Sequence, residues 1–485
     1  MDVIVRILGI ALIIFNSKVV LILSQHPKLL VISYDAFRYD YFNKNVTPFM
    51  NKLRNESAYA DYMMNIFITK TFPNHHTMAT GLYAETHGVT DNEAYDPDDG
   101  NVIPYSYELF HYNKNLLPIW TINEKAAKGR HSGTMMWPGS AFEYQNTTPK
   151  YAQVFNETIP FENRVDTLLS WFKHPNTPIN FGVLYIEEPD ATGHAIGING
   201  PVFNNVLEKL DNLTRYIHRK LDEYHLNDVN VIHLSDHGMA NVAMDRIINL
   251  TNYVNYSDFK MAGTASGMQI FPNPGKYDSV YRGLLQAVHD IPHFRVYKKE
   301  EIPKKYHYGN NTRIGPLFVI ADVGYAFEKL YNAIPFYEDK FNFIATNASE
   351  FGMHGYDNED EEMHPMFFAM GPAFVPRCKL EPFDNVDLVP LFCEILELNC
   401  PRNNGTLGKL TKCLTKYANN KDGASSSVVM ITGIGILITI TAIAGLVSMI
   451  LIRRRQKNVK AKYRRIPKDS DLERFFDGIQ DHENV

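Results

Sequence analysis

Three short apolar runs, each followed closely by acidic or histidine side chains, constrain the fold of this chain most. The runs span 29–34, 181–186 and 229–234, and they lead into Asp35, into Asp190 and His194, and into Asp236 and His237. Apolar runs of this length predict buried strands. A further run at 366–370 and longer stretches with helical spacing, such as 206–224, alternate with them. The alternation predicts the α/β class with a mostly parallel central sheet.

The side chains that follow these runs predict a metal site. In parallel sheets, ligands bind at the carboxyl ends of the strands, so we expect these groups to converge there. Carboxylates alone would repel one another, and imidazoles mixed with carboxylates favour Zn²⁺ over Mg²⁺ or Ca²⁺. A lone Asp after a strand is more often a turn or cap residue. The adjacent Asp236 and His237 are the stronger signal, because two ionisable groups at the end of an apolar strand are costly unless something binds them.

Thr71 is the candidate nucleophile. It lies in the segment Thr69–His75. Taken alone, a threonine before Phe-Pro is usually a helix cap. Beside two metal ions, however, its hydroxyl would have a lowered pKa and could attack an electrophile at neutral pH.

Seven short motifs in this order resemble the ectonucleotide pyrophosphatase/phosphodiesterase family. They are Lys70–His75, Thr80–Tyr83, His87–Asn92, Trp137–Gly139, Glu187–His194, Ser235–Met239 and His354–Asn358. The similarity runs from about residue 28 to about residue 414. It is closest to the short, single-domain branch of the family, members four and five.

The resemblance implies an alkaline-phosphatase-like fold and a two-zinc hydrolase. One zinc would be held by Asp190, His194 and His354. The other would be held by Asp35, Asp236, His237 and the Thr71 oxygen, and the Asn92 amide would stabilise the phosphoryl oxygens. The implied reaction is hydrolysis of extracellular nucleotides to nucleoside monophosphates through a nucleotidyl-threonine. ATP-like nucleotides, dinucleoside polyphosphates and NAD are the candidate substrates.

The resemblance also implies a binding slot for the nucleobase. Phe72 and Phe155 would stack on the base, and Lys70, Trp137 and Tyr185 would line the same region. Phe155 stands where relatives usually have tyrosine, and Ala141 stands where some relatives have a carboxylate. Base selectivity therefore stays open. So do two other functions, a choline-phosphodiester lipase of the same family and a non-catalytic surface receptor.

The ends of the chain predict a type I plasma-membrane protein. We expect a signal peptide at 1–24, with an uncleaved anchor as the alternative, an extracellular catalytic domain at 28–414 and a polar stalk at 415–427. Residues 428–452 are uncharged and mostly apolar, and Arg453, Arg454 and Arg455 follow at once. This predicts a membrane span with a cytoplasmic tail at 453–485. The net charge of −6, without a long basic run before residue 450, argues against nucleic-acid binding. The sequence does not predict an oligomeric state.

Sequons and cysteines fit a secreted domain. Ten Asn-x-Ser/Thr sequons begin at Asn45, Asn55, Asn146, Asn156, Asn212, Asn249, Asn255, Asn310, Asn347 and Asn404. Four cysteines near the end of the extracellular part predict two disulfides, and their spacing leaves three connectivities open. The family resemblance favours Cys393 with Cys413 and Cys378 with Cys400.

Overall fold

The computed structural model describes residues 26–126, 129–418, 444–445 and 447–458. The chain divides into two units, Met1–Ala418 and Asn419–Val485. The described residues of the second unit are helical.

An eight-stranded sheet forms the centre of this unit. Its strands, in spatial order, are β18 (Lys379–Leu380), β2 (Ala58–Ala60), β17 (Phe367–Met370), β8 (Val229–Leu234), β1 (Lys28–Tyr34), β7 (Phe181–Ile186), β5 (Ser132–Met135) and β6 (Tyr151–Gln153). β1 pairs in parallel with both β7 and β8. β17 runs antiparallel to β8 and β2. The four predicted strands and the mostly parallel sheet are confirmed, and the antiparallel β17 makes the sheet mixed.

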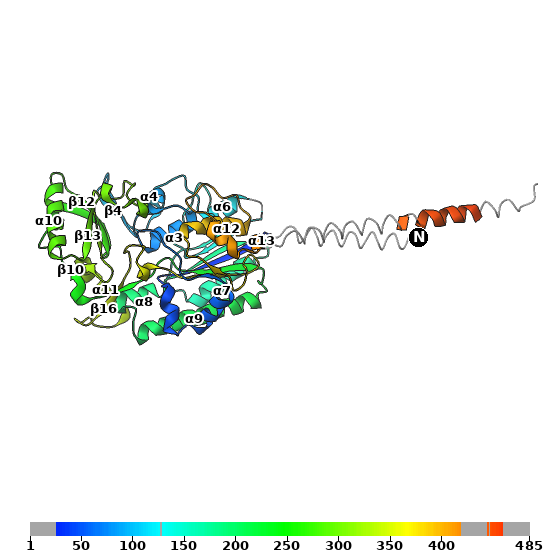
Figure 1. Ribbon diagram of the computed structural model, residues 1–485, viewed down its shortest axis with the longest axis horizontal. Coiled ribbons are helices and arrows are strands. Elements are labelled where there is room, and N and C mark those ends of the chain that lie inside the picture. The colour runs from blue at the N-terminus through cyan, green and yellow to red at the C-terminus, as the bar shows by residue number, and fades with distance from the viewer. Residues whose placement is uncertain (1–25, 127–128, 419–443, 446, 459–485) are drawn as a thin grey trace, which may run out of the picture. The chain divides into compact units, whose positions relative to one another are not determined.

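Helices cover both faces of this sheet (Figure 1). Alternate side chains of β1 enter two different apolar clusters. Leu30 and Ile32 join the cluster of α2 (Pro48–Glu56), α7 (Phe161–Phe172) and α9 (Pro201–Glu223), whereas Leu29 and Val31 join that of α3 (Thr71–Thr80), α6 (Ile119–Ala126) and α12 (Leu388–Leu396). A strand that is buried on both faces explains why its sequence is a continuous apolar run.

A second, antiparallel sheet lies beside the first. Its order is β11 (Phe259–Gly263), β12 (Gly267–Pro272), β14 (Leu317–Ala321) and β13 (Phe294–Lys298), and α10 (Tyr277–Asp290) packs on it. Between the sheets, β16 (Glu350–Met353) pairs with β9 (Ala240–Ala243), which follows β8. This pairing brings the residues after β16 to the carboxyl end of β8.

Shorter elements complete the unit. They are α4 (Ala84–His87), β3 (Ala94–Asp96), β4 (Asn101–Ile103), α5 (Tyr107–Phe110), α8 (Asp190–Ile196), β10 (Ile247–Ile248), β15 (Ala326–Phe327), η6 (Glu328–Asn332), α11 (Ile334–Phe341) and α13 (Thr415–Ala418). The predicted helix at 206–224 is confirmed as part of α9.

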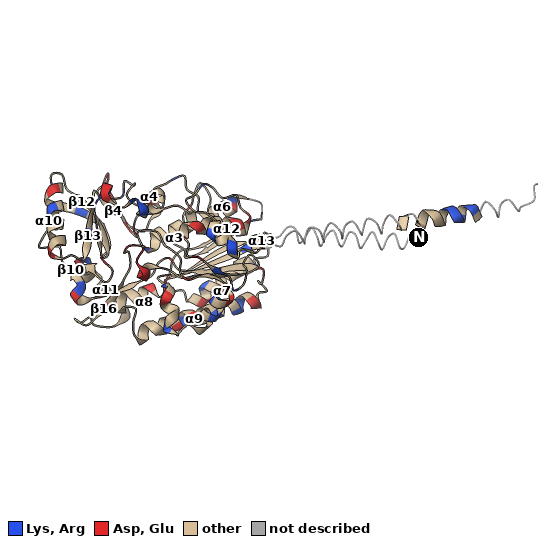
Figure 2. Ribbon diagram, viewed as in Figure 1, with Lys and Arg blue, Asp and Glu red and all other residues tan. Residues whose placement is uncertain are grey.

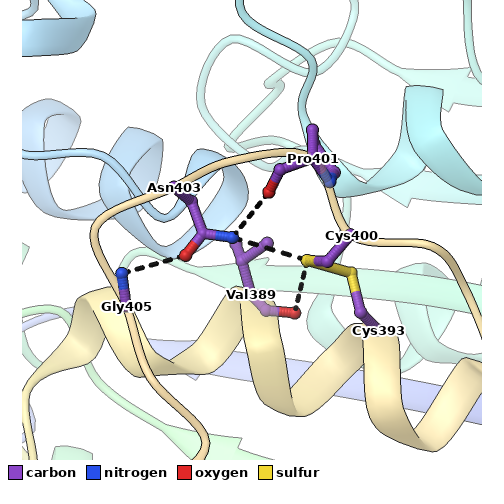
Figure 3. The surroundings of a disulfide bond; sticks show 6 residues. All are labelled: Val389, Cys393, Cys400, Pro401, Asn403 and Gly405. Atoms are coloured by element: carbon purple, nitrogen blue, oxygen red, sulfur yellow. Dashed lines mark hydrogen bonds between the residues drawn. A yellow bond between two sulfur atoms is a disulfide. The ribbon is translucent and has the colours of Figure 1, made fainter.

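The disulfide pairing expected from the family resemblance is wrong. The bonds join Cys378 to Cys413 and Cys393 to Cys400. α12 ends at Leu396, and Glu397 in the left-handed conformation turns the chain back, so that Cys400 returns to Cys393 (Figure 3). A bridge between Phe374 and Leu414 brings the segment before β18 beside the end of the domain, where Cys378 meets Cys413.

The predicted terminal segments fall largely outside the described residues. This holds for the signal peptide at 1–24, most of the stalk, most of the 428–452 span and most of the tail. Residues 415–418, at the start of the predicted stalk, form α13. Among the residues with described positions, no helix combines the length and apolar character needed to cross a membrane.

The surface of the first unit carries both signs of charge. Along α9, blue and red segments alternate, and Arg219 pairs with Glu223 there (Figure 2).

All ten sequon asparagines are exposed.

Candidate active site

The predicted ligands come together at the carboxyl ends of β1, β7 and β8. In the sheet, Tyr34 lies opposite Ile186, and Ser33 lies opposite Leu234. Asp35 follows β1 directly, Asp190 begins α8 shortly after β7, and Asp236 follows β8. His354 directly follows β16. The parallel register therefore places residues that are distant in the sequence at one edge of the sheet.

The ligands form two adjoining clusters. In the first, His237 Nε2 lies 3.4 Å from Asp35 Oδ1 and 3.1 Å from Asp236 Oδ2. In the second, Asp190 Oδ1 lies 3.4 Å from His194 Nε2 and 3.5 Å from His354 Nε2. The rings of His237 and His354 stack at 3.7 Å between centroids, so the two clusters share a boundary. All six predicted side chains are brought together.

Three backbone carbonyls orient the imidazoles. His194 donates from Nδ1 to Gly352 O, His354 to Thr69 O and His237 to Gly238 O, at 2.7, 2.8 and 2.9 Å. With the proton on Nδ1, each Nε2 presents a lone pair to the cluster, as metal-ligating histidines do. His194 Nε2 and His354 Nε2 are only 3.1 Å apart. Two lone pairs at that distance repel, and a cation bound by both would relieve this.

The carboxylates also lack partners where a metal would bind. Asp35 Oδ1, Asp190 Oδ1 and Asp236 Oδ2 are buried without a hydrogen-bond partner in the described part of the chain. Burial raises the pKa of Asp190 to about 7 and lowers the pKa of His194 to about 4. Buried anionic oxygens without donors are costly unless a cation binds them. Nitrogen and carboxylate donors in two such clusters fit zinc.

Thr71 is the first residue of α3. Its Oγ1 lies 3.3 Å from His237 Nε2, at the boundary of the Asp35–Asp236–His237 cluster. The N-terminus of a helix carries partial positive charge, which stabilises an anionic oxygen or a phosphoryl group there. The predicted nucleophile is thus next to the metal ligands.

Asn92 lies beside the same helix end. Its Oδ1 accepts a hydrogen bond of 2.8 Å from the backbone N–H of Phe72. The amide orientation is set by this bond, which leaves Nδ2 as a donor at the edge of a cleft that Asn92 lines together with His194 and His354.

A further layer of side chains supports the ligands. Tyr185 donates to Asp35 Oδ2 at 2.5 Å, and its ring is buried. His75 Nδ1 donates to Thr71 O at 2.8 Å and lies 3.3 Å from Asp236 Oδ2, and its Nε2 bonds with Ser33 Oγ. Trp137 is buried and donates to His75 O. Tyr185 and Trp137 were predicted to line the base slot, and in the structure their polar atoms support the metal ligands. The role of His75 was not predicted, although it lies in the Thr71 motif.

Lys70 is buried and has three acceptors. Its Nζ donates to Thr264 Oγ1, to Ser266 Oγ at 2.9 Å and to His354 O at 2.8 Å. Burial lowers the pKa of Lys70 to about 8. Lys70, which was predicted to contact the substrate, therefore holds the backbone of His354, a predicted metal ligand.

The two side chains predicted to stack on the base, Phe72 and Phe155, contact different aromatic neighbours. Phe72 packs edge-on against Tyr105, with ring centroids 5.2 Å apart, and Phe155 is 47% exposed with its ring 6.0 Å from Tyr185. Tyr105 lies in a loop and was not predicted, because nothing in its local sequence distinguishes it from other surface tyrosines.

Arg164 links the segment that carries Phe155 to the residues that follow β7. It is fully buried and holds Glu187, just after β7, by two hydrogen bonds of 2.5 and 2.9 Å. It also donates to Ile159 O, on the segment that carries Phe155. A bidentate arginine–carboxylate pair is geometrically rigid, so it fixes both segments relative to each other.

Comparison with known proteins identifies the family. The family model for type I phosphodiesterase/nucleotide pyrophosphatase matches residues 29–357. The chain belongs to this family. As a member, it is a hydrolase with an alkaline-phosphatase-like fold, as the resemblance predicted.

Individual members of the type I phosphodiesterase family match over most of their length. A Xenopus laevis bis(5′-adenosyl)-triphosphatase is 37% identical over 425 residues, covering 87% of this chain and 88% of the relative. The human ectonucleotide pyrophosphatase/phosphodiesterase family member 5 is 33% identical, covering 84% and 82%. Among solved structures, an inactive variant of murine ectonucleotide pyrophosphatase/phosphodiesterase 5 in complex with AMP has a TM-score of 0.72 at 35% identity. It covers 80% of this chain and is itself fully covered.

Proposed function

We propose that this chain hydrolyses phosphodiester or pyrophosphate bonds of extracellular nucleotides and releases nucleoside monophosphates, with Thr71 as the nucleophile and two zinc ions as cofactors. One observation carries the proposal. The Thr71 hydroxyl, at the start of α3, lies beside two Asp/His clusters whose free oxygens and inward Nε2 atoms face each other.

The two clusters would hold one zinc each. Asp35, Asp236 and His237 together with Thr71 form one ligand set, and Asp190, His194 and His354 form the other. Two zinc ions bound there would lower the pKa of the nucleophile and neutralise charge on the attacking and leaving oxygens.

The protein's own groups position the substrate. Thr71 Oγ attacks phosphorus, forming a nucleotidyl-threonine that water then hydrolyses. Asn92 Nδ2, at the edge of the cleft, and the backbone N–H of Thr71, the first residue of α3, donate to the phosphoryl oxygens. Phe72 and Phe155 would stack on the base, an interaction of roughly 1–3 kcal/mol per base.

Relatives support this choice of substrate. One is named a bis(5′-adenosyl)-triphosphatase, and a murine relative with one threonine replaced by alanine is described as inactive and was solved with AMP. Two disulfides and ten exposed sequons support an extracellular domain, in line with the proposed type I topology.

A turnover panel on the purified full-length chain tests the proposal. We expect hydrolysis of ATP, a dinucleoside polyphosphate, NAD or p-nitrophenyl thymidine monophosphate, and none of a choline lysophospholipid. Elemental analysis should find about two zinc ions per chain. Activity that persists in a strong chelator, in protein without transition metal, would refute the two-metal mechanism.

A further inference from the structure

A buried hydroxyl interrupts the apolar run of the central strand β1. The strand is apolar from Leu29 to Ile32, and Ser33 follows with a side chain that is fully buried. Side chains alternate along a strand, so Ser33 shares its face with Leu29 and Val31, which pack on the side of α3. A buried hydroxyl is costly without a hydrogen-bond partner, and the partner of Ser33 comes from that side.

The partner is His75, in the second turn of α3. His75 Nε2 and Ser33 Oγ are 2.9 Å apart, and the imidazole is fully buried. On the other side of the ring, Nδ1 lies 2.8 Å from Thr71 O. A carbonyl oxygen only accepts hydrogen bonds, so Nδ1 carries the proton of the neutral ring and Nε2 accepts from the Ser33 hydroxyl. Both ring nitrogens are thus engaged.

The His75 ring also contacts the surroundings of one ligand cluster. Its Nδ1 lies 3.3 Å from Asp236 Oδ2. The ring of Tyr185, whose hydroxyl donates to Asp35 Oδ2, meets the imidazole edge-on at 5.2 Å between centroids. The Trp137 ring meets it edge-on at 4.8 Å. Two hydrogen bonds and two edge-on rings fix the plane of the imidazole.

The hydrogen bond to Thr71 O affects the Thr71 hydroxyl through the backbone. Holding this carbonyl fixes the peptide plane next to the Thr71 Cα, and with it the direction in which the side chain leaves the backbone. Thr71 Oγ1 lies 3.3 Å from His237 Nε2 in this arrangement. A displacement of about 1 Å at a reacting atom can lower a rate by about 10²-fold. Because the His75 ring is fully buried, it can act on a substrate only through its neighbours.

We propose that His75 is a positioning residue for the nucleophile. Supported by Ser33, it holds Thr71 O and thereby orients the Thr71 hydroxyl toward the Asp35–Asp236–His237 cluster. The inference rests on the proposed function, in which Thr71 Oγ attacks phosphorus. It assigns no proton transfer to His75, since a carbonyl engages Nδ1 and Ser33 engages Nε2.

Two substitutions of the same shape separate this role from packing. Asn and Leu share one branched skeleton, and only Asn places an N–H donor where Nδ1 stands. On a nucleotide diester, His75→Leu should lower kcat by about 10²-fold with little change in KM, because the lost contact acts on the attack and not on binding. His75→Asn should recover most of the rate. Elemental analysis after zinc loading should find the wild-type zinc content in both proteins.

His76 provides a matched control on the same helix. It is as buried as His75, but neither of its ring nitrogens has a hydrogen-bond partner among the described residues. His76→Leu should therefore keep a near-normal kcat, and urea titrations report how much each substitution lowers the free energy of unfolding. Equal losses of kcat in His75→Leu and His76→Leu would show that the His75 ring only packs, and would overturn the inference.

A double substitution tests whether His75 acts through the Thr71 oxygen. Thr71→Ala lacks this oxygen, so adding His75→Leu should not lower the remaining kcat further. A second loss as large as the first would place the effect elsewhere and overturn the inference.

Ser33→Ala guards against a His75→Leu protein that does not fold. It keeps the ring and removes its support, so kcat should fall when Thr71 is present and stay unchanged in the Thr71→Ala background. A Ser33→Ala protein with the kcat of the wild type would overturn the inference and leave the proposed function standing. Absence of nucleotide hydrolysis by the zinc-loaded wild type would overturn both.

Discussion

At the scale of single residues, the metal ligands depend on partners with no ionisable signature. Gly352 O, Thr69 O and Gly238 O fix the three imidazoles, and the Tyr185 hydroxyl fixes Asp35. The ligands themselves were predictable, because acids and histidines at strand ends are conspicuous. Their carbonyl partners were not, since any residue supplies a carbonyl.

Tyr185→Phe tests this supporting layer. It removes the hydroxyl that donates to Asp35 Oδ2 at 2.5 Å and leaves the ring in place. Loss of such a partner lowers metal affinity by about 10–100-fold. Zinc competition against a chelator measures it. Tyr216→Phe, which removes a surface hydroxyl bonded to Asp166, is the control and should bind zinc as the wild type does. Equal affinities in all three proteins would remove Tyr185 from the supporting layer.

At the scale of elements, α9 packs on β8 through a histidine pair, of which His233 is buried and His218 partly buried. His218 Nε2 and His233 Nε2 are 3.0 Å apart, and Tyr34 and Thr214 continue the hydrogen-bond chain. Burial lowers the pKa of His218 to about 4, with Asp222 as a weaker opposing charge, and lowers the pKa of His233 well below its usual range. Both imidazoles are therefore neutral in the folded state at pH values where they are protonated in the unfolded chain.

This contact predicts a loss of stability in acid. An unfolded histidine has a pKa of about 6.5, whereas the pKa of folded His218 is about 4. Between these two pH values the unfolded state binds a proton at this residue and the folded state does not, so protonation favours unfolding. The contribution of His218 to the free energy of unfolding is fully present above pH 6.5 and is lost as the pH is lowered. Between pH 7 and pH 5, His218→Gln should lose about 2 kcal/mol less unfolding free energy than the wild type. Urea titrations measure this. His289→Gln, at an exposed site on α10, should follow the wild type, and an unchanged slope in His218→Gln would contradict the prediction.

Elements were predictable to different degrees. β1, β7 and β8 are apolar runs because helices cover both faces, and they are found at the predicted positions. The direction of β17 was not predictable, since an apolar run does not show whether its strand pairs in parallel or antiparallel. The disulfides also depended on tertiary structure, namely the left-handed turn at Glu397 and the bridge from Phe374 to Leu414. The pairing inferred from the family resemblance was therefore wrong for both disulfides.

At the scale of the whole molecule, the candidate site combines residues from two sheets. The parallel sheet supplies Asp35, Asp190 and Asp236, whereas β16, paired with β9, supplies His354. The antiparallel sheet and α11 contribute Gly263 and Tyr337 to the wall of the cleft that His194 and His354 also line. The position of Tyr105, which lies in a loop, was not predictable, because it follows from the tertiary structure and not from local sequence.

The central claim is that Thr71 is the nucleophile, and replacing its hydroxyl tests this most directly. Thr71→Ala leaves the six Asp and His ligands in place, so the protein should fold and retain about two zinc ions. Its kcat on a nucleotide diester should fall by about 10³-fold or more, because outside water does not readily replace an activated nucleophile. Thr71→Ser should keep much of the rate, and Asn92→Ala should lose about 10²–10³-fold. Near-normal kcat in zinc-loaded Thr71→Ala would contradict the account.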